Sequence, residues 1–112
     1  AETRANLDAI LAEAHTRGLP VLLIGFEAPG NFGPAYKAAF DAIYTDLAAQ
    51  YGVALMPNFF APLRALDDGT AQTRAGLLQP DGLHPTAAGV AAIVQELGPA
   101  VVPVIDAVSR RP

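Results

Sequence analysis

Cysteine is absent from the sequence, and serine is almost absent. Without cysteine, the chain can form no disulfide and offers no thiolate as a nucleophile or metal ligand. The one serine, Ser109, lies near the C-terminus, where we expect a polar residue on a solvated turn. The chain therefore has almost no side chain suited to nucleophilic attack.

Positive charge is also scarce. Seven Lys and Arg residues face eleven Asp and Glu residues, which gives a net charge of −4, and only Arg110 and Arg111 form a cluster. Proteins that bind nucleic acid carry a basic stripe or patch, so no nucleic-acid partner is expected. No run reaches the roughly eighteen uninterrupted apolar residues of a membrane span, so no transmembrane segment is expected either.

The remaining composition is that of a folded domain with helices. Apolar residues make up 52% of the 112 residues and charged residues 16%, which is typical of one domain with a core. Apolar positions recur with a helical period over residues 3–17 and 34–51, and a glycine closes each segment. A third helix is expected after Pro85, interrupted at Gly98-Pro99 and followed by a shorter helix over 101–108. Four apolar residues should be buried by the third helix: Val90, Ile93, Val94 and Leu97.

Two short apolar runs, residues 20–26 and 53–56, predict strands buried on both faces, as in a parallel sheet covered by helices. Between the second strand and the third helix, residues 57–79 are irregular, with one helical turn expected near 63–66. This order of elements predicts half of a doubly wound α/β domain. Because a two-stranded sheet is marginal alone, we expect residues outside this chain to complete it.

The stretch PDGLHPT at residues 80–86 contains the candidate catalytic residues. A carboxylate three residues before a histidine can fold back, so that Asp81 holds one imidazole nitrogen of His84. The other nitrogen is then free to take a proton from a nucleophile. Pro85 keeps His84 out of the following helix, which Thr86 can cap. This pattern predicts a general base and its orienting acid.

The same residues also have a purely structural interpretation. Asp, Gly and Pro before a helix are ordinary turn and cap residues. The chain would then be a non-catalytic α/β module that binds a ligand or partner, with Asp81 and His84 structural. A metal site is disfavoured, because these two residues supply only two ligands and His15 belongs to a distant helix.

The segments taken together resemble the SGNH, or GDSL, hydrolases. The block DGLHPTAAG at 81–89 resembles the last conserved block of that family. Residues 24–33 (IGFEAPGNFG) are similar to the arylesterase and acyl-thioesterase I/lysophospholipase branch. Further matching positions are Tyr36, Phe40, Ile43-Tyr44 and Tyr51-Gly52-Val53. The resemblance runs in order over about residues 3–99.

The resemblance implies a three-layer α/β/α sandwich with a parallel, flavodoxin-like sheet. It also implies hydrolysis of carboxylic esters or thioesters through an acyl-serine intermediate, with no metal or other cofactor. Asp81 and His84 match the acid and base of the family's triad. Many relatives are exported, which would suit a periplasmic or secreted protein.

The family's other motifs are absent from this chain: the Gly-Asp-Ser nucleophile block, the oxyanion-hole glycine and the Gly-x-Asn-Asp block. Residues 1–112 are therefore expected to be the C-terminal portion of one hydrolase domain. Its partner would be the N-terminal portion of the same protein, which carries the serine. The chain alone is expected to be inactive.

Candidate substrate contacts follow from the expected topology. Loops at the carboxyl ends of parallel strands form the ligand crevice of open α/β sheets. Phe26, Glu27, Ala28 and Pro29 follow the first strand, and Leu83 adjoins the histidine, so these five residues are expected to line an acyl ester or thioester pocket. Phe26 and Leu83 are equally suited to a core, whereas the charge of Glu27 must face solvent or find a partner.

Overall fold

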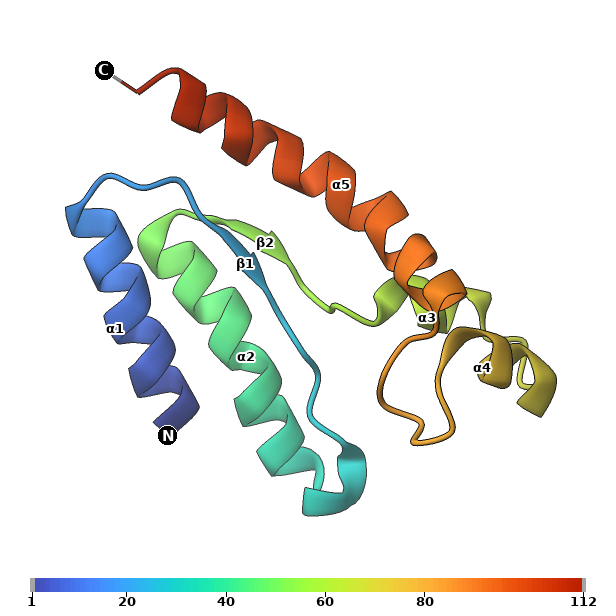
Figure 1. Cartoon of the computed structure of the whole chain (residues 1–112). Coiled ribbons are helices and arrows are strands. Elements are labelled where there is room, and N and C mark those ends of the chain that lie inside the picture. Colours follow the sequence, from blue (N-terminus) through green and yellow to red (C-terminus); the bar gives the residue numbers. More distant parts are fainter. Residues whose placement is uncertain (1, 112) are drawn as a thin grey trace. The chain divides into compact units, whose positions relative to one another are not determined.

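The computed structural model describes residues 2–111 (Figure 1). Its elements, in chain order, are α1 (Glu2–Thr16), β1 (Leu22–Ile24), the 3₁₀ helix η1 (Gly30–Phe32), α2 (Pro34–Tyr51), β2 (Ala54–Met56), α3 (Ala61–Leu66), α4 (Ala71–Leu77) and α5 (Ala87–Ser109). They gather into two compact units. The first unit holds the described residues up to 58 and those from 100 onward, and the second holds residues 59–99.

The first unit is built on a parallel pair of strands. β1 and β2 are in register, with Leu23 opposite Leu55. Helices α1 and α2 lie side by side (Figure 1), and α2 contacts both strands. The core consists of six buried residues, Leu11, Leu23, Ile43, Tyr44, Leu47 and Ala48. The predicted parallel pairing and the predicted helix over residues 34–51 are therefore confirmed.

The boundaries of α1 and α2 follow the predicted stop signals. Gly18 and Gly52 both have positive φ values, 64° and 62°, which favour glycine because it has no Cβ atom. The Gly52 N–H donates to the carbonyl oxygen of Ala48 and so closes α2. Pro34 occupies the first turn of that helix, where its missing N–H costs no hydrogen bond.

The strands and the connection after them differ from the prediction. β1 has three residues rather than the expected seven, and the Gly25 N–H adds one further bond to the Met56 carbonyl oxygen, 2.8 Å. The segment expected to be irregular contains two helices, α3 and α4. α4 begins at a local cap, because the Thr70 side chain accepts the Thr73 N–H. Its sequence has no apolar period to reveal it.

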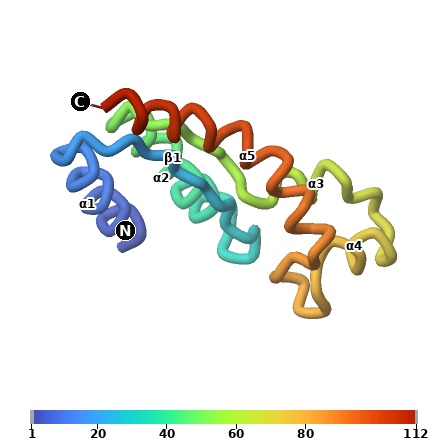
Figure 2. Tube along the Cα trace, turned by 45° about the horizontal axis from the view of Figure 1, so that its top comes forward, coloured from blue at the N-terminus to red at the C-terminus, as the bar shows by residue number. Residues whose placement is uncertain are grey.

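Helix α5 corrects the expected interruption at Gly98-Pro99. One helix of 23 residues continues through this pair (Figures 1 and 2). Pro99 and Pro103 each remove one backbone donor and disturb one turn, and the helix continues past both of these local losses.

The predicted burial along α5 is also partly wrong. Ile93 is buried, but Val90 and Val94 are 48% and 53% exposed.

α5 is also long and apolar enough to cross a membrane, by length and composition alone. Its most apolar window has a mean hydropathy of 1.7, and 11% of that window is buried. The search for about eighteen uninterrupted apolar residues did not detect this segment, because Gln95 and Glu96 divide its apolar run. A core helix of a water-soluble protein meets the same criteria, so this finding does not establish a membrane span.

Candidate active site

The loop that carries His84 is closed at its base by backbone hydrogen bonds. Leu78 and Pro85 form an isolated antiparallel bridge, and the Thr86 N–H donates to the Leu77 carbonyl oxygen, 2.9 Å. Inside the loop, the Gln79 N–H donates to the His84 carbonyl oxygen, 2.7 Å. The loop is therefore a short turn closed by backbone hydrogen bonds. His84 lies before the helix, as the proline that follows it predicts.

Asp81 folds back on this turn and holds the histidine through both of its carboxylate oxygens. Oδ2 lies 2.5 Å from His84 Nδ1. Oδ1 accepts the backbone N–H groups of Leu83, 2.9 Å, and His84, 3.0 Å. Gly82 permits the reversal with a φ of +67°. The predicted contact between the carboxylate and one imidazole nitrogen is present.

These bonds change the acidity of the carboxylate. The hydrogen bond from the His84 side chain is the largest cause, and the two backbone donors add to it, so the pKa of Asp81 falls from 3.8 to about 2. The group is exposed, so hydrogen bonding rather than burial sets this value. Asp81 is thus an ionised acceptor at any ordinary pH, as an orienting acid must be.

The second imidazole nitrogen remains available. The side chain of His84 is 67% exposed, and within residues 2–111 its Nε2 atom has no hydrogen-bond partner. A ring held by one nitrogen with the other free can accept a proton from a hydroxyl that approaches it.

Thr86 anchors the loop to both neighbouring helices. Its hydroxyl accepts the Gly89 N–H, 3.1 Å, and donates to the Gly76 carbonyl oxygen of α4, 2.6 Å. The predicted helix cap is therefore confirmed. The contact with α4 adds a restraint between the two ends of the loop.

The predicted substrate residues are divided between the two units. Phe26, Glu27, Ala28 and Pro29 follow β1 in the first unit, whereas Leu83 belongs to the second unit with the Asp81–His84 pair. Phe26 is 43% exposed and Leu83 61% exposed, so neither is a plain core residue. Ala28 is buried.

The loop after β1 is held by a lysine that the sequence analysis did not single out. Lys37 Nζ lies 2.7 Å from Asp41 Oδ2 and 3.4 Å from Glu27 Oε2, and donates to the Ala28 carbonyl oxygen, 3.1 Å. Asp41 Oδ1 in turn accepts the Ala28 N–H, 2.7 Å. Glu27 therefore has a cationic partner. The spacing of Lys37 and Asp41 on α2 is the only sequence signal for this clamp.

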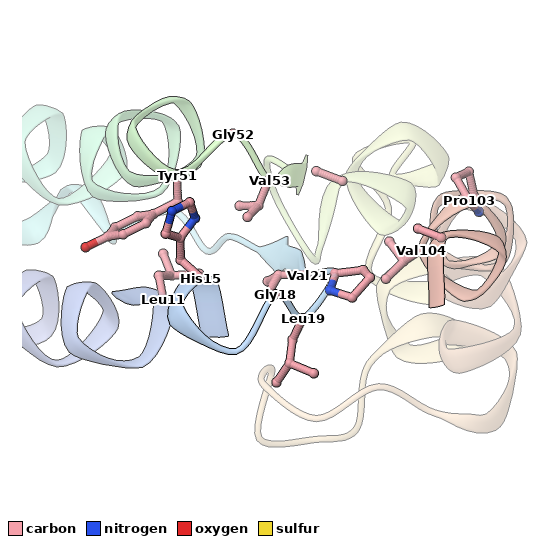
Figure 3. Close-up of a pocket in the computed structure, with 13 residues that line it drawn as sticks. Leu11, His15, Gly18, Leu19, Val21, Tyr51, Gly52, Val53, Pro103 and Val104 are labelled. Carbon is pink, nitrogen blue, oxygen red and sulfur yellow. The ribbon is translucent and has the colours of Figure 1, made fainter. Parts of the chain in front are cut away.

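An apolar cavity of the first unit lies elsewhere. It has a volume of about 410 Å³ and is lined by α1, α2 and the end of α5, with His15 and Tyr51 at its wall (Figure 3). The two rings are 6.2 Å apart, and Tyr51 Oη donates to Asp8 Oδ1, 2.5 Å. His15 is exposed on its helix. This cavity contains none of the predicted site residues.

Comparison with known proteins identifies the relatives of the chain. No protein-family profile matches it. It is 31% identical to Esterase TesA of Pseudomonas aeruginosa over 105 residues, which cover 94% of this chain and 48% of the relative. It is also 31% identical to thioesterase 1/protease 1/lysophospholipase L1 of Escherichia coli K12 over 84 residues, 75% of this chain and 36% of that protein.

Solved structures give the same relationship. A crystal structure of TesA matches with a TM-score of 0.72 and 34% identity, over 93% of this chain and 53% of the other. The crystal structure of AlinE4, described as a SGNH-hydrolase family esterase, matches with a TM-score of 0.58 and 41% identity, over 91% and 50%. The expected fold class, a part of an α/β sandwich with a parallel sheet, is confirmed. The chain thus spans about half the length of the TesA and AlinE4 proteins that it matches, and over nearly its whole length it is similar to esterases that include a member of the SGNH-hydrolase family.

Proposed function

We propose that this chain supplies the base and the orienting acid of a serine esterase or thioesterase. His84 is the general base and Asp81 its acid partner. The chain is the C-terminal portion of one hydrolase domain, and the N-terminal portion contributes the serine. The observation that carries this proposal is the contact between His84 Nδ1 and Asp81 Oδ2, which leaves Nε2 free to accept a proton. The similarity of the chain to esterases supports the same role.

Each proton in the proposed reaction has a defined origin and destination. As the serine oxygen attacks the carbonyl carbon, His84 Nε2 takes the hydroxyl proton and then gives it to the departing alcohol or thiol. In the second half, Nε2 takes a proton from the water that attacks the acyl carbon. It then returns that proton to the serine oxygen as the bond between the acyl carbon and this oxygen breaks, and the acyl group leaves as a carboxylic acid. Asp81 fixes the tautomer and stabilises the imidazolium ion in both halves. The oxyanion donors belong to the other portion.

The serine of this chain does not suit the role of nucleophile. Ser109 lies on the last turn of α5, in the first unit, and its hydroxyl donates to the Ile105 carbonyl oxygen, 3.2 Å. A hydroxyl committed to its own helix is ordinary for a helix end. The nucleophile is therefore assigned to the N-terminal portion.

Two surfaces of this chain, the open edges of its sheet and an exposed apolar face of α5, support the N-terminal portion as its partner. The described sheet has only two strands, so one edge of each strand lacks a neighbour. Four apolar residues of α5 are about half exposed and share one helix face, at spacings of 4, 11 and 3 residues: Val90, Val94, Ile105 and Val108. The N-terminal portion would add strands to the sheet and cover this face, which is the usual solution for α/β layers.

The proposal is tested on the assembled protein, by which we mean this chain together with its serine-bearing portion. Hydrolysis of p-nitrophenyl butyrate by the assembled protein should fall by about 10⁴-fold or more in the His84→Ala variant, since triad members act as a unit. Asp81→Asn should lower kcat by about 10⁴-fold. His15→Ala is the matched control, because this exposed histidine lies in another unit, and it should retain activity.

Three further results would contradict the assignment. Full esterase activity of this chain alone would place the nucleophile within it. Full activity of the His84→Ala variant would show that His84 is not the general base. Failure of a fluorophosphonate to label a serine in the assembled protein would favour a binding module in which Asp81 and His84 only shape a turn.

A further inference from the structure

Gln79 stands at the start of the loop that carries the histidine, and it makes three hydrogen bonds to the rest of that loop. Its backbone N–H donates to the His84 carbonyl oxygen, 2.7 Å, and its carbonyl oxygen accepts the Gly82 N–H, 2.8 Å. Its side-chain Nε2 donates to the Pro85 carbonyl oxygen, 3.2 Å. One residue therefore bonds the turn, the histidine and the residue that follows the histidine.

The Pro85 carbonyl oxygen lies just outside the hydrogen-bond ladder of α5. The first bond of that ladder runs from the Val90 N–H to the Thr86 carbonyl oxygen, 2.8 Å. The Gly89 N–H, which helical geometry would direct to the Pro85 carbonyl oxygen, donates to the Thr86 hydroxyl instead, 3.1 Å. The side-chain amide of Gln79 therefore supplies the donor that the helix does not.

The peptide groups on both sides of His84 are held within this one loop. Asp81 Oδ1 accepts the His84 N–H, 3.0 Å, which restrains the peptide group before the histidine. Pro85 has no N–H, so the peptide group after the histidine can bond only through the His84 carbonyl oxygen, and the Gln79 N–H donates to that oxygen. The Gln79 side chain restrains the next peptide group, at the Pro85 carbonyl oxygen. The backbone that carries the imidazole is therefore restrained on both sides.

A glutamine amide suits this position chemically. Its partner is a carbonyl oxygen, so only a donor can bond there. The amide donates without carrying a charge, whereas lysine or arginine would place a cation near the imidazole and disfavour the imidazolium ion that forms when His84 takes a proton. Among residues 2–111, the Gln79 amide bonds only to the Pro85 carbonyl oxygen. Removal of the amide therefore changes this one bond.

We propose, on the basis of the hydrolase function above, that Gln79 is a positioning residue for His84. Asp81 sets the rotation of the ring, and the Gln79 amide holds the backbone from which the ring projects, so that Nε2 stays directed at the proton it takes. Catalytic groups must be held within about 0.5 Å and 10–20° of their productive geometry. Gln79 acts through the loop rather than on the substrate.

The test removes the amide in the assembled protein and measures hydrolysis of p-nitrophenyl butyrate at about pH 8.5, where an imidazole of ordinary pKa 6.5 is neutral. Gln79→Met keeps the length of the side chain and removes the donor. Since one neutral hydrogen bond is worth a factor of about 2 to 12, kcat should fall about fivefold, with KM within about twofold of the parent. Gln72→Met is the matched control, because Gln72 is an exposed glutamine on α4 of the same unit, and this variant should keep the parent kcat.

Gln79→Glu is a second variant of the same size, in case Gln79→Met does not fold. Its ionised carboxylate cannot donate at about pH 8.5, so kcat should fall at least as far. The Asp81 carboxyl group reports on the ring without any substrate, because the bond from the His84 side chain is the largest cause of its low pKa. In Gln79→Met the Asp81 midpoint, followed by carboxyl ¹³C shifts, should move upward from about 2, and in Gln72→Met it should not.

Either the parent kcat or an unchanged Asp81 midpoint in Gln79→Met would overturn the positioning role and leave the hydrolase function intact. A rise in KM at constant kcat would also overturn it, because Gln79 would then contribute to substrate binding. Hydrolysis that survives His84→Ala would instead overturn the proposed function itself. The Asp81 midpoint would still show whether the Gln79 amide holds the ring.

Discussion

Gly89 of α5 lies directly against the Leu77 carbonyl oxygen at the end of α4. A Cβ atom at position 89 would meet that oxygen at 2.1 Å, well inside the closest distance that such atoms reach. The same oxygen accepts the Thr86 N–H. The base of the loop that carries the Asp81–His84 pair therefore depends on a glycine in the first turn of the following helix.

Gly89→Ala should destabilise the protein, because the methyl group must push two backbone segments apart. Overpacking of this kind typically costs about 1–3 kcal/mol. Chemical denaturation of the assembled protein gives the free energy of unfolding. Gly76→Ala in α4 is the matched control: no atom lies within 4 Å of its Cβ position, so alanine should stabilise the helix by about 0.5–1 kcal/mol. Equal effects of the two substitutions would show that the contact at Gly89 is not tight.

The Asp81 carboxylate should remain ionised in acid. With its pKa lowered to about 2, Asp81 is about nine-tenths ionised at pH 3, where an ordinary carboxylate of pKa 3.8 is mostly protonated. The folded-state pKa lies below the ordinary value, so the stabilisation from this group is present above about pH 3.8 and is lost as the pH falls toward 2. Carboxyl ¹³C shifts of labelled aspartate follow this titration.

His84→Ala provides the control for that titration. The side-chain bond from the histidine is the largest cause of the low pKa, so its removal should move the Asp81 midpoint back toward 3.8. The two backbone donors remain, and the pKa should stay somewhat low. An unchanged midpoint in this variant would mean that the ring does not bond the carboxylate in solution.

Lys37→Met should loosen the loop after β1. The ammonium group bonds the side chains of Glu27 and Asp41 and the Ala28 carbonyl oxygen, and a thioether of similar length replaces none of these bonds. Faster amide hydrogen exchange is expected at Ala28, with strand β2 unaffected.

Arg17→Met is the comparison for this prediction. It removes another i,i+4 ion pair, the one between Arg17 and Glu13 on the exposed surface of α1. Amide exchange at Ala28 should therefore stay at the parent rate in this variant. Equal exchange at Ala28 in the Lys37→Met and Arg17→Met proteins would contradict the clamp.

Local interactions explain what could be predicted from the sequence. The helices over 2–16 and 34–51 end at glycines that supply a left-handed conformation within one turn. The contact between Asp81 and His84 joins residues three positions apart, and a glycine between them allows the reversal. Such features depend on a few neighbouring residues, so the amino-acid sequence by itself determined them.

Contacts between distant segments were decided by the tertiary structure. No local pattern reveals that Lys37 holds the backbone of Ala28, or that α3 and α4 enclose a cavity beside Leu83. The exposure of Val90 on α5 likewise depends on what packs against the helix rather than on its period. Periodicity gives the apolar side of a helix, but burial requires a partner surface, and the position of that surface is set by the whole fold.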